Sequence, residues 1–171
     1  MKKYKIAFLD RDGVINKSNI NAGYIGKINH FKFVNGALNA IRLLKTKGFL
    51  VVVVTNQSGV ARGYFKYRQV QKLHKYIQNE LRKINTKIDS FYFCPFHIDG
   101  VIKKYKKKTN LRKPGIGMFK KVQKKWNIDL KNSLMIGDQL TDMQFAKKAK
   151  IKGYMFKDKN LFKFVKKILN S

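Results

Sequence analysis

Four of the nine acidic residues lie in two short motifs, each of which follows an apolar run. Asp10 and Asp12 belong to FLDRDGVIN, and Asp138 and Asp142 belong to IGDQLTD. Carboxylates at positions i and i+2 repel each other unless a cation or a shared proton lies between them. An acidic turn that bends at Gly13 would also explain the first motif. If the two motifs meet in space, they offer the hard oxygen ligands that Mg²⁺ prefers.

Hydrogen-bond donors occur at two further places: after a second apolar run, and directly before a predicted helix. Thr55 and Asn56 end VVVVTN, where a hydroxyl, an amide and the backbone N–H groups of the next turn could bind a phosphoryl oxygen. An ordinary strand-to-loop turn would explain the same residues. Arg112 and Lys113 stand directly before Pro114, and this position distinguishes Lys113 from the many other lysines. Asp142 could equally serve to complement the dipole of a helix N-terminus.

The elements that would position these side chains alternate between strand-like and helix-like patterns. This alternation predicts a doubly wound α/β fold with a parallel sheet, in which chemistry gathers at the carboxyl ends of the strands. No repeat or linker divides the chain, so we expect one domain, residues 1–171. Apolar runs predict strands at Lys5–Leu9, Phe49–Val54, Ile88–Phe93, Ser133–Ile136 and Tyr154–Phe156. Helical spacing predicts helices at Asn35–Lys47, Tyr67–Ile84, Ile116–Trp126, Thr141–Lys150 (with Thr141 as N-cap) and Leu161–Leu169.

The charge of the chain is strongly positive, with 39 Lys and Arg residues against nine Asp and Glu and a formal net charge of +30. Such a balance attracts phosphate in nucleic acid, on an anionic membrane or on a small substrate. Because the lysines are spread along the whole chain and arginines are few, a lysine-rich composition explains the charge as well.

No apolar run approaches the roughly 20 residues of a membrane-spanning helix. The first residues carry no secretory signal pattern, and a single cysteine excludes an intramolecular disulfide. We therefore expect a cytoplasmic protein without membrane contact.

Together, the DxDG motif, a strand that ends in Thr-Asn, a lysine and a GDxxxD motif resemble the haloacid-dehalogenase (HAD) superfamily of phosphatases over nearly the whole chain. The stretches FLDRDGVIN, TNQSGVARGYF, CPxH, RKPxxGM and IGDQLTDMQxA are similar to the D-glycero-D-manno-heptose 1,7-bisphosphate 7-phosphatase family, to which histidinol-phosphate phosphatases are close. The resemblance implies a Rossmann-like domain without a large cap. It also implies a Mg²⁺-dependent phosphomonoester hydrolase of heptose (lipopolysaccharide precursor) synthesis, which forms an aspartyl-phosphate intermediate.

The resemblance assigns roles to individual residues. Asp10 would be the nucleophile, and Asp12 the general acid that becomes the base for water. Mg²⁺ would bind the carboxylates of Asp10 and Asp138 and the backbone carbonyl of Asp12, while Thr55 and Lys113 would hold the transferring phosphoryl oxygens. The sugar contacts would come from Tyr24, Asn56, Arg112 and Gln139.

Two features depart from the family pattern. Gln139 stands where we expect a lysine, which affects the contact to a second phosphate. The segment Lys17–Ala22 is longer than the equivalent family loop, so the fit of the substrate would differ.

The segment 94–114 corresponds to a loop that often binds zinc in this family through a C-x-H…C-x-C pattern. Here the matching positions are Cys94, Phe96, Thr109 and Leu111, so only the first ligand is left. A structural Zn²⁺ site needs four N or S ligands. We therefore expect no structural zinc, and a loop ordered by the packing of Phe96, Ile98 and Ile102.

The lysine run 103–108 in this loop is explained either as a solvated segment or as a device that steers a bisphosphorylated sugar. We expect a monomer that acts on a small phosphorylated sugar. The alternatives are a histidinol-phosphate phosphatase and, from a different class, a nucleic-acid-binding protein or polynucleotide 3′-phosphatase. The sequence shows neither a second domain nor a pattern of stacking aromatic residues for that last class.

Overall fold

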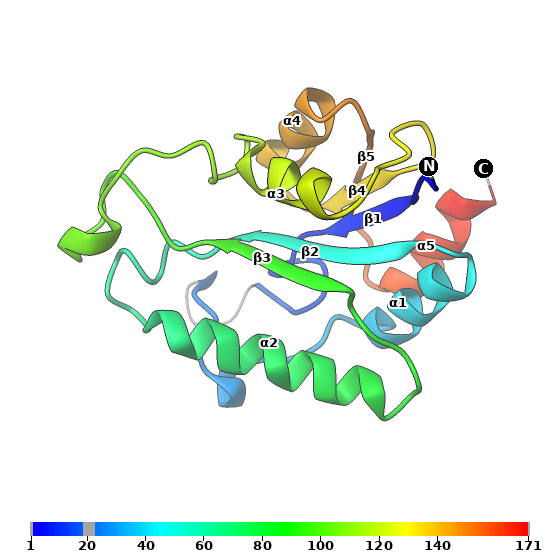
Figure 1. The fold of residues 1–171 in the computed structure, drawn as a ribbon. Helices are drawn as coiled ribbons and strands as arrows, with labels where there is room; N and C mark the ends of the chain where they lie inside the picture. Colours follow the sequence, from blue (N-terminus) through cyan, green and yellow to red (C-terminus); the bar gives the residue numbers. More distant parts are fainter. Residues whose placement is uncertain (1, 19–22, 171) are drawn as a thin grey trace.

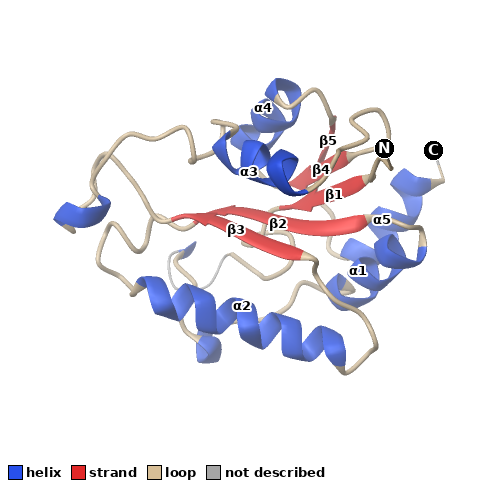
Figure 2. Ribbon diagram, in the orientation of Figure 1, coloured by secondary structure: helices blue, strands red, loops and turns tan. Residues whose placement is uncertain are grey.

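Five parallel strands form one sheet, in the order β3-β2-β1-β4-β5, with helices on both faces (Figures 1 and 2). The computed structural model describes residues 2–18 and 23–170, so residues 19–22 of the long loop discussed above lie outside the described part. The strands are β1 (Ile6–Leu9), β2 (Leu50–Asn56), β3 (Ser90–Cys94), β4 (Leu134–Gly137) and β5 (Lys152–Met155). The helices are α1 (Ala37–Thr46), α2 (Tyr67–Arg82), α3 (Gly117–Lys125), α4 (Leu140–Lys148) and α5 (Leu161–Leu169), with short 3-10 helices η2 (Ile28–His30) and η3 (Lys103–Tyr105). The doubly wound α/β fold that the sequence predicts is confirmed, with no large cap among the described residues.

The sheet is buried on both faces because successive side chains of its central strands enter two separate cores. Ala7 and Leu9 of β1 pack with α1, α2 and α5, whereas Ile6 and Phe8 pack with α3 and α4. Strand β1 is the middle strand, paired with β2 on one side and β4 on the other, so that Leu9 lies beside both Val53 and Ile136. This pairing brings the carboxyl ends of β1, β2 and β4 to one edge of the sheet.

The boundaries of the elements differ from the sequence prediction in two informative places. Strand β2 continues beyond Val54, because Thr55 pairs with Phe93 and Asn56 pairs with Cys94. The N-cap of α4 is Gln139, so the prediction of Thr141 as the N-cap is wrong. The reason is that the backbone N–H of Gln139 donates to the carboxylate of Asp142, three residues later (3.1 Å), which lets the helix begin earlier.

The loop between β3 and α3 extends away from the sheet beyond the carboxyl ends of the strands (Figure 1). Ile98 and Ile102 are 56% and 40% exposed, so the hypothesis that they pack the loop in place of a metal is wrong for these two residues. Main-chain bonds hold this part of the loop instead, since the carbonyl of Ala61 accepts from the backbone N–H groups of Val101 and Ile102 (2.8 and 2.9 Å). Phe96 does pack, against the ring of Tyr105, with ring centroids 5.9 Å apart.

Among residues 2–18 and 23–170, none of the helices has the length and apolarity that crossing a membrane would require.

His74 is a buried titratable group on α2, at the interface between this helix and the sheet. Its ring stacks on Phe91 (centroids 4.6 Å apart) and meets the edge of Phe93, and its Nε2 atom has no hydrogen-bond partner in the described structure. Burial, and next the nearby guanidinium of Arg11, lower the pKa of His74 well below its ordinary value of 6.5. The folded state therefore keeps this imidazole neutral.

We expect acid to destabilise the protein through His74. The unfolded chain takes up a proton near pH 6.5 while the folded chain does not, so the full stability is present above that pH. It is then lost by up to about 1.4 kcal/mol per pH unit as the pH falls towards the folded-state pKa. His74→Phe keeps an aromatic ring in the same place and should flatten this dependence. Urea unfolding from about pH 7.5 to about pH 5 measures it, with His30→Phe as the control. An unchanged slope in the His74 variant would contradict the assignment.

Candidate active site

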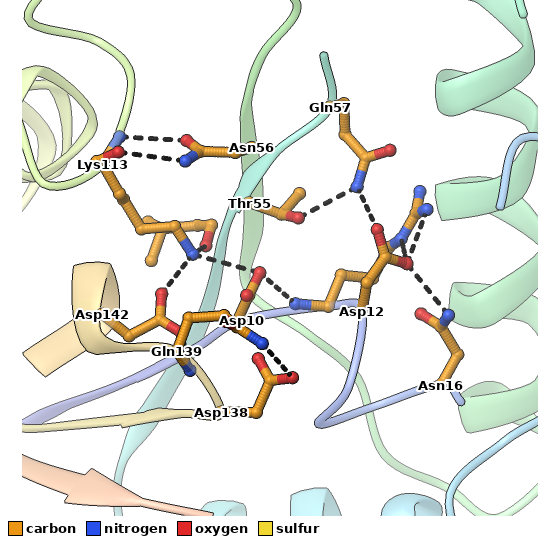
Figure 3. A network of polar contacts seen from close by, with 12 residues as sticks. Asp10, Asp12, Asn16, Thr55, Asn56, Gln57, Lys113, Asp138, Gln139 and Asp142 are labelled. Carbon is orange, nitrogen blue, oxygen red and sulfur yellow. Dashed lines mark hydrogen bonds and ion pairs between the residues drawn. The ribbon is translucent and has the colours of Figure 1, made fainter. Parts of the chain in front are cut away.

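The two acidic motifs and the Thr-Asn strand end meet at the carboxyl edge of the sheet (Figure 3). Asp10 follows β1, where its backbone N–H donates to the carbonyl of Ile136 on β4 (3.0 Å). Asp138 follows β4, and Thr55 and Asn56 end β2. Of the nine residues that the sequence predicted for the site, all but the buried Thr55 line one cavity of about 570 Å³. These eight are Asp10, Asp12, Tyr24, Asn56, Arg112, Lys113, Asp138 and Gln139.

Lys113 is almost completely buried and binds three segments of the chain at once. Its ammonium lies 2.7 Å from the Oδ1 atom of Asp142 and 3.1 Å from Oδ1 of Asp10, and it donates to the carbonyl oxygen of Val54 (2.8 Å). Burial lowers the pKa of Lys113, but the two carboxylates outweigh burial and raise this pKa above its ordinary value. The lysine is therefore charged, and it is fixed beside Asp10.

The amide of Asn56 fixes the backbone of Lys113. Its Oδ1 atom accepts from the Lys113 N–H (2.9 Å), and its Nδ2 atom donates to the Lys113 carbonyl (3.1 Å). Each half of the side-chain amide is thus engaged with the chain itself. Asn56 lines the cavity, and its clearest structural effect is to hold Lys113 at the end of β2.

Asp10 has the most strongly perturbed carboxyl group in the cavity. The pKa of Asp10 is raised to about 7, chiefly by burial; the ammonium of Lys113 opposes this rise, and the carboxylates of Asp142, Asp12 and Asp138 add to it. Burial also raises the pKa of Asp138. The ammonium of Lys113 therefore does not fully offset the burial of these two carboxyl groups and their repulsion by neighbouring carboxylates.

The acidic residues fit a divalent cation. Carboxylate oxygens of Asp10, Asp138 and Asp142 lie within 4.8 Å of one another, and Oδ1 of Asp138 is buried without a hydrogen-bond partner in the described structure. When all three are ionised, these carboxylates and the ammonium of Lys113 leave two uncompensated negative charges. Asp142 uses both of its oxygens, for Lys113 and for the N–H of Gln139. The contacts of Asp10 with Lys113 and with the N–H of Arg11 both use Oδ1, so Asp10 and Asp138 are the more available ligands.

Gly13 allows the close approach of these two motifs. It has a φ of +86°, and a Cβ atom there would lie 2.0 Å from the carboxylate of Asp138. Any other residue at this position would displace Asp138 from the site.

The carboxylate of Asp12 points away from the acidic cluster and towards three hydrogen-bond donors, Arg11, Asn16 and Gln57. These three residues were not identified from the sequence as part of the site. The Oδ1 atom of Asp12 accepts from Arg11 and from Asn16 (2.9 Å each), and its Oδ2 atom accepts from Gln57 (2.8 Å). Arg11 is fully buried and also donates to the carbonyl of Ile25 (2.6 Å). An arginine between two acids at a strand end was the available signal for this network.

Arg112 lines the cavity, and the guanidinium of Arg62 lies near enough to influence its pKa. Arg112 is half-buried, with Nη1 unpartnered in the described structure, and Arg62 likewise has a buried Nε atom without a partner. Burial, and to a smaller extent the charge of Arg62, lower the pKa of Arg112. The ring of Tyr24 meets the edge of Tyr64 at 4.5 Å between centroids, and Gln139 donates to Oδ2 of Asp138 (3.0 Å). Nη1 of Arg112 thus has no hydrogen-bond partner among the described residues and could donate to a second anionic group.

The chain matches a protein family over residues 5–165, and this family is described as polynucleotide kinase 3 phosphatase. Two curated relatives are named D-glycero-beta-D-manno-heptose-1,7-bisphosphate 7-phosphatase. The one from Rhodopseudomonas palustris is 41% identical over 163 residues, which cover 95% of this chain and 89% of the relative. The one from Photorhabdus laumondii is 44% identical over 144 residues, which cover 84% of this chain and 75% of the relative.

Two solved structures have the same fold at a TM-score of 0.82. One is a candidate HAD-like phosphatase from Mesorhizobium loti, 34% identical, in an alignment that covers 91% of this chain and 73% of that one. The other is D,D-heptose 1,7-bisphosphate phosphatase from B. bronchiseptica in complex with magnesium and phosphate, 25% identical, with 97% and 98% covered.

We predict that Lys113→Met destabilises the fold, because it leaves the buried carboxylates of Asp10 and Asp142 without their cation. The free energy of unfolding should fall by roughly 3–5 kcal/mol, and a second substitution, Asp142→Asn, should restore part of it. Urea unfolding without divalent ions measures both changes. Lys83→Met, which breaks an exposed ion pair with Glu80, is the control and should unfold almost as the wild type does. A Lys113→Met protein of wild-type stability would refute the central role of this ammonium.

Proposed function

This chain belongs to the polynucleotide kinase 3 phosphatase family of HAD-like phosphatases, and we propose that it removes the 7-phosphate of D-glycero-D-manno-heptose 1,7-bisphosphate with the help of Mg²⁺. The observation that carries the proposal is the convergence of Asp10, Asp138 and the buried ammonium of Lys113 in one cavity. A nucleophilic carboxylate, metal ligands and a fixed cation are what hydrolysis through an aspartyl-phosphate requires.

In this mechanism the carboxylate of Asp10 attacks phosphorus, while Asp12 protonates the departing sugar oxygen. Lys113 and the hydroxyl of Thr55 hold the transferring phosphoryl oxygens, whose charge they stabilise. Asp12 then takes a proton from water, which cleaves the aspartyl-phosphate. Asp10 and Asp138, with the backbone carbonyl of Asp12, would hold Mg²⁺, which neutralises phosphoryl charge when bound.

The substrate is assigned from the named relatives and from the charge of the cavity. Relatives that are 41% and 44% identical are named for a heptose 1,7-bisphosphate. Arg112, with Arg62 behind it, supplies cations for a second phosphate even though Gln139 replaces the expected lysine. Tyr24 would contact the sugar, and Asn56 would act mainly through Lys113.

Several sequence predictions complete the proposal. We take residues 1–171 as a single phosphatase domain that acts as a monomer in the cytoplasm, and we expect no structural Zn²⁺. Cys94 is buried, and its thiol lies 3.8 Å from the carbonyl oxygen of Phe96. Among the described residues, the acidic cluster is the one group of three or more His, Cys, Asp or Glu side chains arranged to hold a metal.

A 3′-phosphorylated oligonucleotide is the second candidate substrate, because the description of the family names a polynucleotide phosphatase. The high positive charge is compatible with it.

We predict that Asp10→Asn abolishes turnover without loss of the fold. The amide has the shape of the carboxylate but cannot form the phosphoryl-enzyme, so kcat should fall by at least about 10³-fold. Phosphate release and circular dichroism measure activity and fold. Asp158→Asn, at an exposed position, serves as the control. An Asp10→Asn enzyme with a near-normal rate would exclude this mechanism.

A substrate panel tests the assigned specificity. The panel contains heptose 1,7-bisphosphate, fructose 1,6-bisphosphate, histidinol phosphate and a 3′-phosphorylated oligonucleotide, each with Mg²⁺ or with a chelator. We expect the highest kcat/KM for the heptose bisphosphate, and loss of all activity with the chelator.

Arg112→Gln should raise KM for the heptose bisphosphate by about tenfold or more, since it removes a charged contact to the second phosphate. The same substitution should change KM for a monophosphate much less.

In the substrate panel, a higher kcat/KM of the wild-type enzyme for the oligonucleotide than for the heptose bisphosphate would replace the heptose assignment with the second candidate.

A further inference from the structure

The two oxygens of the Asp12 carboxylate have different surroundings. Oδ1 accepts three hydrogen bonds, from Nε and Nη2 of Arg11 (3.1 and 2.9 Å) and from Nδ2 of Asn16 (2.9 Å). Oδ2 accepts one, from Nε2 of Gln57 (2.8 Å). Since three donors already occupy Oδ1, Oδ2 is the oxygen with room for a proton or a second partner.

Gln57 contacts two functional groups with the same nitrogen. Nε2 donates one hydrogen to Oδ2 of Asp12 and the other to the hydroxyl oxygen of Thr55 (3.0 Å), as Figure 3 shows. The side chain is 2% exposed and lies in the wall of the cavity. Its backbone N–H donates to the carbonyl of Cys94 at the end of β3 (2.8 Å), so the residue is anchored to the sheet.

We propose that Gln57 is a positioning residue, which sets Oδ2 of Asp12 at a fixed place relative to the hydroxyl of Thr55. This inference rests on the proposed function, in which Thr55 binds the phosphoryl group and Asp12 protonates the leaving oxygen. The amide holds the proton-carrying oxygen and the phosphoryl-binding hydroxyl in one rigid unit. Arg11 and Asn16 fix the opposite oxygen and therefore the direction of the whole carboxylate.

The step that depends on this geometry is the departure of the alcohol. The P–O bond to Asp10 forms while the P–O bond of the ester breaks, and the proton on Oδ2 of Asp12 moves to the leaving oxygen, which departs as the alcohol. In the second step water attacks phosphorus and gives its proton back to Oδ2, and the bond to Asp10 breaks to release phosphate. A misplaced Oδ2 impairs the first step only when the leaving oxygen needs a proton.

The dependence on the leaving group supplies the test. A sugar alkoxide is a strong base and requires protonation, whereas p-nitrophenolate is stable as an anion and does not. The ratio kcat/KM is suitable for both esters, because it reports only the steps up to departure of the alcohol.

The variant is Gln57→Met, which has nearly the same volume and no amide. With heptose 1,7-bisphosphate, kcat/KM should fall by about 100-fold, mainly through kcat, because general acid catalysis contributes about 10²–10⁴-fold. With p-nitrophenyl phosphate it should fall by no more than about threefold.

Gln78→Leu is the matched control. The side-chain amide of Gln78 donates to the carbonyl of Ile88 (2.8 Å) and accepts from its backbone N–H (3.0 Å). Gln78 is outside the catalytic motifs, so its role is purely structural. This substitution should lower stability without changing the ratio between the two esters.

Equal losses on the two esters, or no loss on either, would overturn the positioning role. A uniform rise in KM would instead mean that Gln57 binds substrate directly, which also overturns it. A wild-type protein inactive on both esters would overturn the proposed function itself, so the two failures are distinguishable. If Gln57→Met fails to fold, Gln57→Asn keeps the amide but is one methylene too short, and the same change in the ester ratio is expected.

Discussion

The buried ammonium of Lys113 is the interaction on which the geometry of the site depends. It joins Asp10 after β1, the carbonyl of Val54 in β2 and Asp142 in α4, which are distant in sequence and close in space. Burial and the neighbouring carboxylates raise the pKa of Asp10 to about 7 even with this ammonium beside it, so without Lys113 the ionised form of Asp10 would be still less favourable. The position of the lysine is in turn set by the two hydrogen bonds between the side-chain amide of Asn56 and the backbone of Lys113. A nucleophile, a strand end and a helix start are therefore fixed by one charge.

The same ion pairs leave the site short of positive charge, even though the whole chain has a formal charge of +30. Most lysines elsewhere are exposed, and among the described residues Lys113 is the lysine in contact with the carboxylates that the sheet and Gly13 enclose. The deficit of two charges is therefore local, and a divalent cation at Asp10 and Asp138 would remove it. A bound phosphoryl group then restores negative charge next to Lys113.

Much of the fold and part of the site could be predicted because they depend on local pattern. Continuous β-branched runs predicted the strands, and the acids at their ends predicted the meeting of Asp10 with Asp138. The contribution of Gln57 could not be predicted, since it depends on which way a side chain turns at a strand end, and the position of Arg11 between two acids was a signal that its type alone did not resolve. Ile98 and Ile102 were wrongly expected to be buried, because main-chain bonds to Ala61 hold their loop without apolar packing. Local pattern thus locates the elements, and tertiary hydrogen bonding decides the details.

Arg11 connects the catalytic turn to two further parts of the molecule. Its guanidinium binds Asp12 on one side and the carbonyl of Ile25, next to the cavity residue Tyr24, on the other. The same positive charge lowers the pKa of His74 in α2, after the larger effect of burial. A protonated His74 would place a second positive charge near Arg11. The two cations would repel each other and so weaken the ion pair between Arg11 and Asp12. The neutral state of His74 therefore serves two purposes: it suits the buried interface of α2, and it leaves the Arg11–Asp12 ion pair undisturbed. In this way the stability of the fold is linked to the geometry of Asp12.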